Sequence, residues 1–266
     1  MLEQIQAIIL GAIQGITEFI PVSSSGHLML AGKAMGDTAN LHLLVQALDF
    51  GTVIALVIFF RKKIWRIIRQ ACVQHDYRLL RNIIITSLPV CTLGLLLHKL
   101  IEHTSCFTLP LAIAIALGLV GIVMIVIERL PHLSSVDNAT QLSASRALLI
   151  GIAQCFALIP GVSRSGSTII AGKLVGLDSR NAAEYSFIAS LPVMFALILK
   201  LFVTDHVYLI NNFAIITLGN VFAFICGMAT IKVLLSYLSN HGLKLFGKYR
   251  VLLSVVIILA VLFGLL

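Results

Sequence analysis

Charged residues are scarce in this sequence. They make up 11% of its 266 residues, whereas hydrophobic residues make up 59%. A soluble domain carries about a quarter charged residues. So few charges cannot cover a surface that faces water on all sides, so the composition excludes a soluble globular domain and indicates an integral membrane protein. The net charge of +8 is assigned to cytoplasmic loops. No basic patch is interleaved with aromatic residues, so nucleic acid is not expected as a partner.

Cysteine is also sparse. The five cysteines are scattered along the chain, and no C-x-x-C pair occurs among them. A disulfide framework and a structural zinc site are therefore not expected.

What the sequence does contain is long apolar stretches. A membrane-spanning helix needs about 20 mostly apolar residues. Six stretches meet or nearly meet this length, at roughly 43–60, 83–101, 109–129, 181–203, 212–236 and 250–266. Two further apolar regions, 2–36 and 147–176, are each interrupted by a polar loop rich in serine and glycine. The pieces after these loops are too short to span, which predicts two re-entrant helical hairpins.

Loop charges give each connection a side of the membrane. Residues 61–82 carry seven Lys or Arg and residues 237–250 carry three, namely Lys244, Lys248 and Arg250, whereas 102–108 and 203–211 carry none. Cytoplasmic loops are enriched in basic residues. If both hairpins are re-entrant, the basic loops all fall on the cytoplasmic side and the loops without Lys or Arg on the outer side. The first hairpin then enters from the outer side and the second from the cytoplasmic side.

The two interrupted regions are copies of one another. When residues 11–36 are compared with 151–176 without gaps, ten of the 26 positions are identical. Opposite entry makes this an inverted-topology repeat, a design used by transporters. The predicted fold is an all-α integral membrane protein with six transmembrane helices and two re-entrant hairpins. It forms a single domain over 1–266, with repeat one at about 1–128 and repeat two at about 141–266.

The second loop is suited to binding an anion. Arg164 lies between apolar segments, where an arginine is costly unless it has a partner or a function. Its planar fork matches phosphate oxygens, although a structural ion pair is the alternative. A helix that begins after the loop adds N–H groups. The residues expected to bind substrate here are Gly161, Ser163, Ser165, Gly166 and Thr168.

The first loop carries complementary chemistry. Glu18 precedes it in an apolar stretch and is suited to bind a divalent cation, Mg²⁺ or Ca²⁺, or to act as a base. Gln14 lies one helical turn earlier and is a candidate second metal ligand. The loop itself supplies Ser24 and His27 as catalytic candidates, with Ser23 and Ser25 expected to bind substrate.

These motifs resemble a known family. Residues 14–27 read QGITEFIPVSSSGH, and residues 160–168 read PGVSRSGST. Both are similar to motifs of the bacterial undecaprenyl-diphosphatases, the bacitracin-resistance family, and the resemblance covers essentially the whole chain. One difference is that the family often has Glu at its first acidic position, where this chain has Gln14. Asp49 is a candidate source of the missing negative charge.

The resemblance implies an enzyme that removes the terminal phosphate of undecaprenyl diphosphate. The reaction takes place on the outer, periplasmic face of the bacterial cytoplasmic membrane and recycles the lipid carrier for peptidoglycan synthesis. It also implies dependence on a divalent metal, and bacitracin resistance on overproduction. The expected partners are the lipid substrate and membrane lipids, with a homodimer as an open option.

The mechanism and the function class each have an alternative. Arg164 is expected to stabilise the transition state. Ser24 is the candidate nucleophile with His27 as its base, and direct attack by water is the alternative. A lipid flippase or transporter that uses the inverted repeat is the alternative function. The unequal loops favour catalysis, because Glu18 and His27 lie in one copy and Arg164 in the other.

Overall fold

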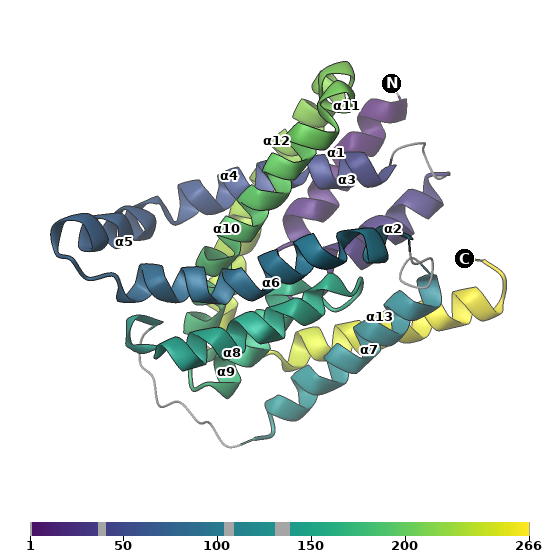
Figure 1. The fold of residues 1–266 in the computed structure, drawn as a ribbon. Coiled ribbons are helices and arrows are strands. Elements are labelled where there is room, and N and C mark those ends of the chain that lie inside the picture. Colours follow the sequence, from purple (N-terminus) through teal and green to yellow (C-terminus); the bar gives the residue numbers. More distant parts are fainter. Residues whose placement is uncertain (1, 37–40, 104–108, 131–138, 266) are drawn as a thin grey trace.

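The computed structural model describes residues 2–36, 41–103, 109–130 and 139–265, and all regular structure in these ranges is helical (Figure 1). The helices are α1 (Leu2–Thr17), α2 (Ser24–Ala34), α3 (Leu41–Ala47), α4 (Asp49–Phe59), α5 (Arg61–Val73), α6 (Arg78–His103), α7 (Pro110–Ile127), α8 (Ala144–Cys155), α9 (Arg164–Leu174), α10 (Ser179–Thr204), α11 (His206–Asn211), α12 (Phe213–Leu238) and α13 (Lys244–Leu262). Short 3-10 turns lie at Ala139–Gln141 and Phe156–Leu158. The predicted all-α class is confirmed.

Six segments of the described chain are long and apolar enough to cross a membrane. They are Leu41–Phe59, Arg78–Leu97, Pro110–Ile127, Ser179–Thr204, Phe213–Leu238 and Lys244–Leu262. The six predicted spans are therefore confirmed, with shifted ends. The first span consists of two helices, α3 and α4, which meet at Leu48. The last begins at Lys244, six residues earlier than predicted, so Arg250 lies inside a helix and not in a cytoplasmic loop.

Both interrupted regions fold as a helix, a polar loop and a short second helix. The second helices, α2 and α9, have 11 residues each. At 1.5 Å per residue such a helix covers about 16 Å, roughly half the hydrocarbon thickness of a bilayer. Each packs against the helix that precedes it, α2 against α1 and α9 against α8. This geometry is compatible with re-entrant hairpins, whose entry from opposite faces stays a prediction.

The two halves of the chain are interleaved. Helix α1 of the first half packs along α12 of the second, and α8 of the second half packs along α6 of the first (Figure 1). Helices α7 and α13 form a third long pair across the halves. The largest apolar core contains residues of both halves, including Phe19, Met124, Ile150 and Phe187. This exchange of partners brings the two polar loops to the same part of the molecule.

Glycines allow the exchanged helices to approach closely. A Cβ atom placed on Gly11 of α1 would collide with the backbone of Gly219 in α12, and one on Gly15 would lie 2.9 Å from Cys226 Cβ. On the other side, a Cβ on Gly151 of α8 would lie 2.7 Å from Thr86 O in α6. Small residues of this kind let membrane helices pack at short distance, where dispersion and backbone contacts hold them together.

This packing predicts that Gly11→Ala lowers stability. The added methyl has no space against α12, so the helices must separate and lose contacts. We expect a fall of about 1–3 kcal/mol in the free energy of unfolding, measured as a lower midpoint of thermal unfolding in detergent. Gly94→Ala in α6 is the matched control, because a Cβ there meets only Leu158 Cδ2 at 3.6 Å. Equal midpoints for the two variants would contradict the close-packing interpretation.

Candidate active site

The two polar loops share an unusual backbone conformation at the serine that precedes the second helix. Ser23 and Ser163 have φ values of 73° and 76°, in the left-handed region that serine rarely adopts. In each loop the serine Oγ lies 3.1 Å from the Oγ two residues later, in Ser25 and Ser165 respectively. Ser163 Oγ also accepts a hydrogen bond from the N–H of Gly166 and so caps α9. Strained backbone of this kind is frequent at functional sites.

Arg250 ties the two loops together from behind. It is fully buried in α13 and donates only to backbone carbonyl oxygens in its recorded hydrogen bonds. Nη1 donates to Pro21 O of the first loop at 3.1 Å. Nη2 donates to Gly161 O and Val162 O of the second loop at 2.7 and 3.1 Å. Nε donates to Leu117 O of α7 at 3.2 Å. One side chain therefore fixes the spacing of both loops.

An ion pair joins the loops at their front. Arg164 Nη2 donates to Glu18 Oε1, and both side chains are largely buried. The other oxygen of this carboxylate, Oε2, accepts from Ser24 Oγ at 2.7 Å and from Gln14 Nε2 at 3.1 Å. Glu18 therefore contacts Arg164 from the second loop, and Ser24 and Gln14 from the first half of the chain. Charge-assisted hydrogen bonds of this kind are the strong ones.

These side chains line a polar cavity of about 200 Å³. Its polar lining consists of Glu18, Ser23, Ser24, Ser25, Asp49, Ser163 and Arg164. Its remaining wall is apolar and is formed by Val90, Ala157, Leu158, Ile159, Val193 and Leu197. A cavity that combines an arginine and hydroxyl groups with an apolar wall suits a ligand that has an anionic head and a hydrocarbon chain.

Comparison with known proteins shows which family the chain belongs to. The sequence profile described as "Bacitracin resistance protein BacA" matches residues 7–256. The chain belongs to the BacA family. Similar proteins named undecaprenyl-diphosphatase include one from Nitrosomonas europaea, 36% identical over 98% of this chain and 96% of the relative. One from Cereibacter sphaeroides is 38% identical over 97% of each chain. Undecaprenyl-diphosphatase 1 from Burkholderia lata is 36% identical over 96% of this chain and 94% of the relative.

The structure brings most of the predicted BacA-family site residues together. Glu18, Ser24 and Arg164 are in direct contact. Three further serines predicted to bind substrate, Ser23, Ser25 and Ser163, line the same cavity. Ser165 is buried beside it, with its hydroxyl 3.1 Å from Ser163 Oγ.

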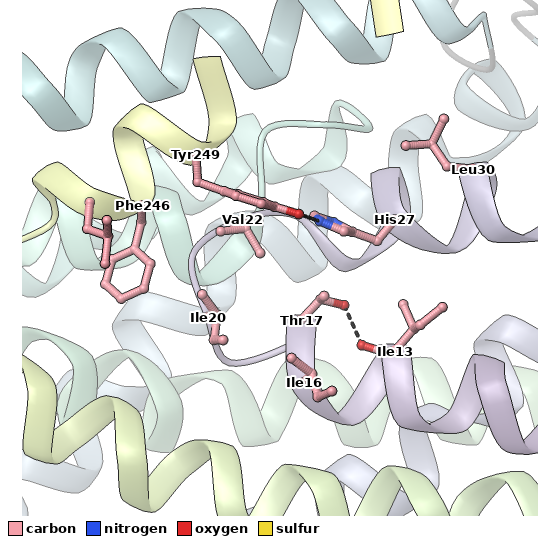
Figure 2. A pocket seen from close by; sticks show the side chains of 10 residues that line it. Ile13, Ile16, Thr17, Ile20, Val22, His27, Leu30, Phe246 and Tyr249 are labelled. Atoms are coloured by element: carbon pink, nitrogen blue, oxygen red, sulfur yellow. Dashed lines mark hydrogen bonds between the residues drawn. The ribbon is translucent and has the colours of Figure 1, made fainter. Parts of the chain in front are cut away.

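His27 is not placed where the sequence interpretation needed it. Its Nδ1 lies 2.8 Å from Ser23 O, and its Nε2 lies 2.7 Å from the hydroxyl of Tyr249. Figure 2 shows the stacked His27 and Tyr249 rings in a separate, largely apolar cavity of about 570 Å³. A carbonyl oxygen only accepts, so Nδ1 carries a proton. The direct contact between His27 and Ser24 was a wrong expectation. Glu18 takes that place, and His27 supports the loop backbone at Ser23.

Three residues predicted to bind substrate have structural contacts instead. Thr168 is buried, and its hydroxyl lies 2.5 Å from Ser186 Oγ and donates to Arg164 O at 2.8 Å. Gly161 has φ 95°, and a Cβ there would lie 2.7 Å from Ile113 O. Gly166 is buried with its N–H on Ser163. These residues shape the second loop, and none of them lines the polar cavity.

Two side chains offer oxygen atoms that suit a hard divalent cation: Glu18, which lines the cavity, and Gln14, which contacts Glu18 but is not itself part of the lining. Gln14 is 2% exposed, and its Oε1 is buried without a hydrogen-bond partner next to the Glu18 carboxylate. No group of three or more His, Cys, Asp or Glu that could hold a metal ion is found in the described ranges. Mg²⁺ is typically bound by one or two carboxylates together with substrate phosphates and water. The carboxylate of Glu18 and the amide oxygen of Gln14 therefore fit Mg²⁺ without a group of three such side chains.

Sequence reasoning missed Arg250, although a signal was present. The apolar run after it, from Val251 to Leu266, has 16 residues, fewer than the about 20 that a spanning helix needs. The helix must therefore begin earlier and carry Arg250 into the membrane, where an arginine needs partners. Glu184 of α10 is not part of the cavity lining and pairs with Lys63 at 2.6 Å and with Arg180.

The carbonyl contacts of Arg250 predict a large loss of stability for Arg250→Leu. The loop and α7 carbonyl groups would lose their donor, at about 1–3 kcal/mol for each group left unsatisfied. Arg250→Lys, with a single nitrogen, should recover only part of the loss. Lys248→Leu on the same helix is the control, because Lys248 is exposed. Midpoints of thermal unfolding in detergent provide the measurement, and a leucine variant as stable as this control would refute the assignment.

Proposed function

We propose that this protein is an undecaprenyl-diphosphatase. It removes the terminal phosphate of undecaprenyl diphosphate and returns undecaprenyl phosphate, the lipid carrier of peptidoglycan synthesis. Membership of the BacA family and the printed names of the similar proteins support the substrate. The observation that carries the proposal is the Glu18, Ser24 and Arg164 cluster, in a cavity with one apolar wall.

Arg164 is the group that recognises phosphate. Its guanidinium is planar and permanently charged, and it matches two phosphate oxygens at once. In the structure without substrate its partner is the Glu18 carboxylate. A diphosphate carries more negative charge than one carboxylate, so it competes for the same guanidinium. Binding of substrate therefore weakens the contact of Arg164 with Glu18 Oε1, whereas Oε2 keeps the hydrogen bond from Ser24.

Ser24 is the nucleophile in the proposed reaction. Its Oγ already donates to Glu18 Oε2 at 2.7 Å, so the proton passes to Glu18 as Oγ attacks the terminal phosphorus. The bond from phosphorus to the bridging oxygen breaks, and undecaprenyl phosphate leaves. Water then attacks the phosphorus of the phosphoserine, and the bond from phosphorus to Ser24 Oγ breaks. Glu18 returns its proton to Oγ, takes up the proton that the water loses and passes it to solvent as phosphate leaves. Direct attack by a water molecule that Glu18 deprotonates is the alternative.

A divalent cation, Mg²⁺ or Ca²⁺, is part of the proposal. Glu18 and the unpartnered Oε1 of Gln14 are the residues that would hold it. When bound, such an ion neutralises charge on the diphosphate and its leaving group. The chain's own contribution is the fixed position of these oxygens on α1, held there by the close contact of α1 with α12.

The apolar wall of the cavity gives the prenyl chain a path. Val90 comes from α6, and Val193 and Leu197 come from α10, so the chain passes beside two spanning helices into lipid. The distribution of basic residues places the loops after these helices on the outer side. The proposed location is the bacterial cytoplasmic membrane, with the site reached from the periplasmic or outer face. Overproduction is expected to confer bacitracin resistance, and a homodimer stays a prediction.

The decisive experiment is phosphate release by the purified protein. In detergent with Mg²⁺, the full chain should release phosphate from undecaprenyl diphosphate, and excess chelator should stop the reaction. Arg164→Ala should lower kcat/KM about 10²–10³-fold, as losses of charge-stabilising groups do. Arg180→Ala is the control, because Arg180 is 53% exposed at the start of α10.

Two outcomes of this assay would contradict the proposal. An Arg164→Ala enzyme within about tenfold of the wild type, about 1.4 kcal/mol, would show that the site is wrongly assigned. No phosphate release with any divalent ion would favour the flippase or transporter instead.

The nucleophile is tested by trapping. With substrate labelled in its terminal phosphate and rapid acid quenching, label should appear on Ser24, and Ser24→Ala should lose both the label and at least about a hundredfold in rate. Ser25→Ala is the comparison, because its hydroxyl contacts Ser23 and not Glu18. It should still form the labelled protein. Near-normal turnover by Ser24→Ala would establish direct attack by water.

A further inference from the structure

Asp49 is a second carboxylate in the polar cavity, on a different helix from Glu18. It is the first residue of α4 and lines the cavity together with Glu18 and Arg164. Gln14 Nε2 donates to Asp49 Oδ1 at 2.5 Å and to Glu18 Oε2 at 3.1 Å. The amide of Gln14 therefore lies between the two carboxylates, and both are within reach of a single atom.

A break between α3 and α4 sets the position of Asp49. Asn220 of α12 inserts its amide into the junction of α3 and α4. Its Oδ1 accepts from the N–H of Gly51 at 2.5 Å, and its Nδ2 donates to Ala47 O at 2.9 Å. In a continuous helix the N–H of Gly51 would donate to Ala47 O. The amide of Asn220 replaces that hydrogen bond, so the helical hydrogen-bond pattern is interrupted at this turn. Asp49 lies on the opened turn, where the N-terminal end of α4 also favours a negative charge.

Glu18 and Asp49 differ in their partners. Glu18 is paired with Arg164, whereas Asp49 makes no ion pair in the described part of the chain. Its recorded side-chain hydrogen bond comes from a neutral amide. A carboxylate at membrane depth is costly without a positive partner. The amide beside it has a buried Oε1 without a partner, and a half-turn of this amide about its last side-chain bond would turn Oε1, in place of Nε2, toward both carboxylates. Both observations indicate a positively charged ligand between α1 and α4.

We propose that Asp49 is the second carboxylate ligand of a divalent cation that Glu18 and the Oε1 of Gln14 also hold. This inference rests on the proposed function, because the cation serves the same reaction. In this chain the negative charge that accompanies Glu18 lies on α4, at Asp49, whereas Gln14 on α1 is neutral. Two carboxylates and an amide oxygen form a hard oxygen site that leaves room for phosphate oxygens and water.

The competing interpretation is that Asp49 only orients Gln14. The two interpretations are separated by measuring the binding of Mn²⁺ to the full chain in detergent without substrate. Electron paramagnetic resonance monitors the binding. Asp49→Asn keeps the shape and loses the charge. It should raise the Kd for Mn²⁺ at least about tenfold, since affinity depends on the number of charged ligands. Asp49→Asn combined with Gln14→Glu places the charge on α1 and should restore Kd to within about threefold of the wild type. Asp76→Asn is the control, because Asp76 is exposed and pairs only with Arg78.

Each outcome decides the inference. An Asp49→Asn protein that unfolds at the wild-type midpoint and keeps the wild-type Kd would overturn it. Absence of Mn²⁺ binding by the wild type would overturn it as well. If Asp49→Asn does not fold, the double variant decides, since weak binding by a folded double variant would overturn the inference. The phosphatase proposal fails separately, by absence of phosphate release from the wild type.

Discussion

Backbone carbonyl groups that leave a helix inside a membrane need donors from the protein, because lipid chains offer none. Each of the two polar loops has such carbonyl groups, and the loops lie close together. Arg250 supplies hydrogen-bond donors to carbonyl groups of both loops. Its guanidinium donates to Pro21 O on one side and to Gly161 O and Val162 O on the other. Because one rigid fork serves both loops, neither loop can shift without breaking the contacts of the other. The spacing between Ser24 and Arg164 depends on this constraint.

The same arrangement sets the electrostatics of the site. A buried guanidinium bonded to carbonyl oxygens keeps its full charge behind the loops, while Arg164 places a second charge in front. Fixed charges and donors that exclude water stabilise developing negative charge without reorganisation. Glu18 is the counter-charge that keeps Arg164 stable before substrate arrives. In the proposed mechanism an anionic substrate replaces Glu18 at Arg164, and Ser24 already donates to that carboxylate.

The sequence predicted features that depend on local composition, and it failed where packing between distant segments decides. Apolar runs located the six spans, and interruption by serine and glycine located both loops. The junction at Leu48 depends on Asn220, 172 residues later, whose amide opens the helix. Arg250 looked like a loop charge because its carbonyl partners belong to other segments. His27 is close to Ser24 in sequence, but the turn at Ser23 directs it to Tyr249 instead.

The two loops show how one backbone motif can divide a reaction between its copies. At the position of Ser24 the second copy has Arg164, and at the position of Glu18 it has Leu158. Both copies keep the same glutamine, yet only Gln14 meets carboxylates, whereas the buried amide of Gln154 has no hydrogen-bond partner. If the arginine were in the same loop as Glu18, it would pair with its neighbours in that loop. It would then bind the substrate from that loop alone. With the arginine in the opposite loop, the proposed mechanism puts the phosphate between the copies and therefore needs both loops at once.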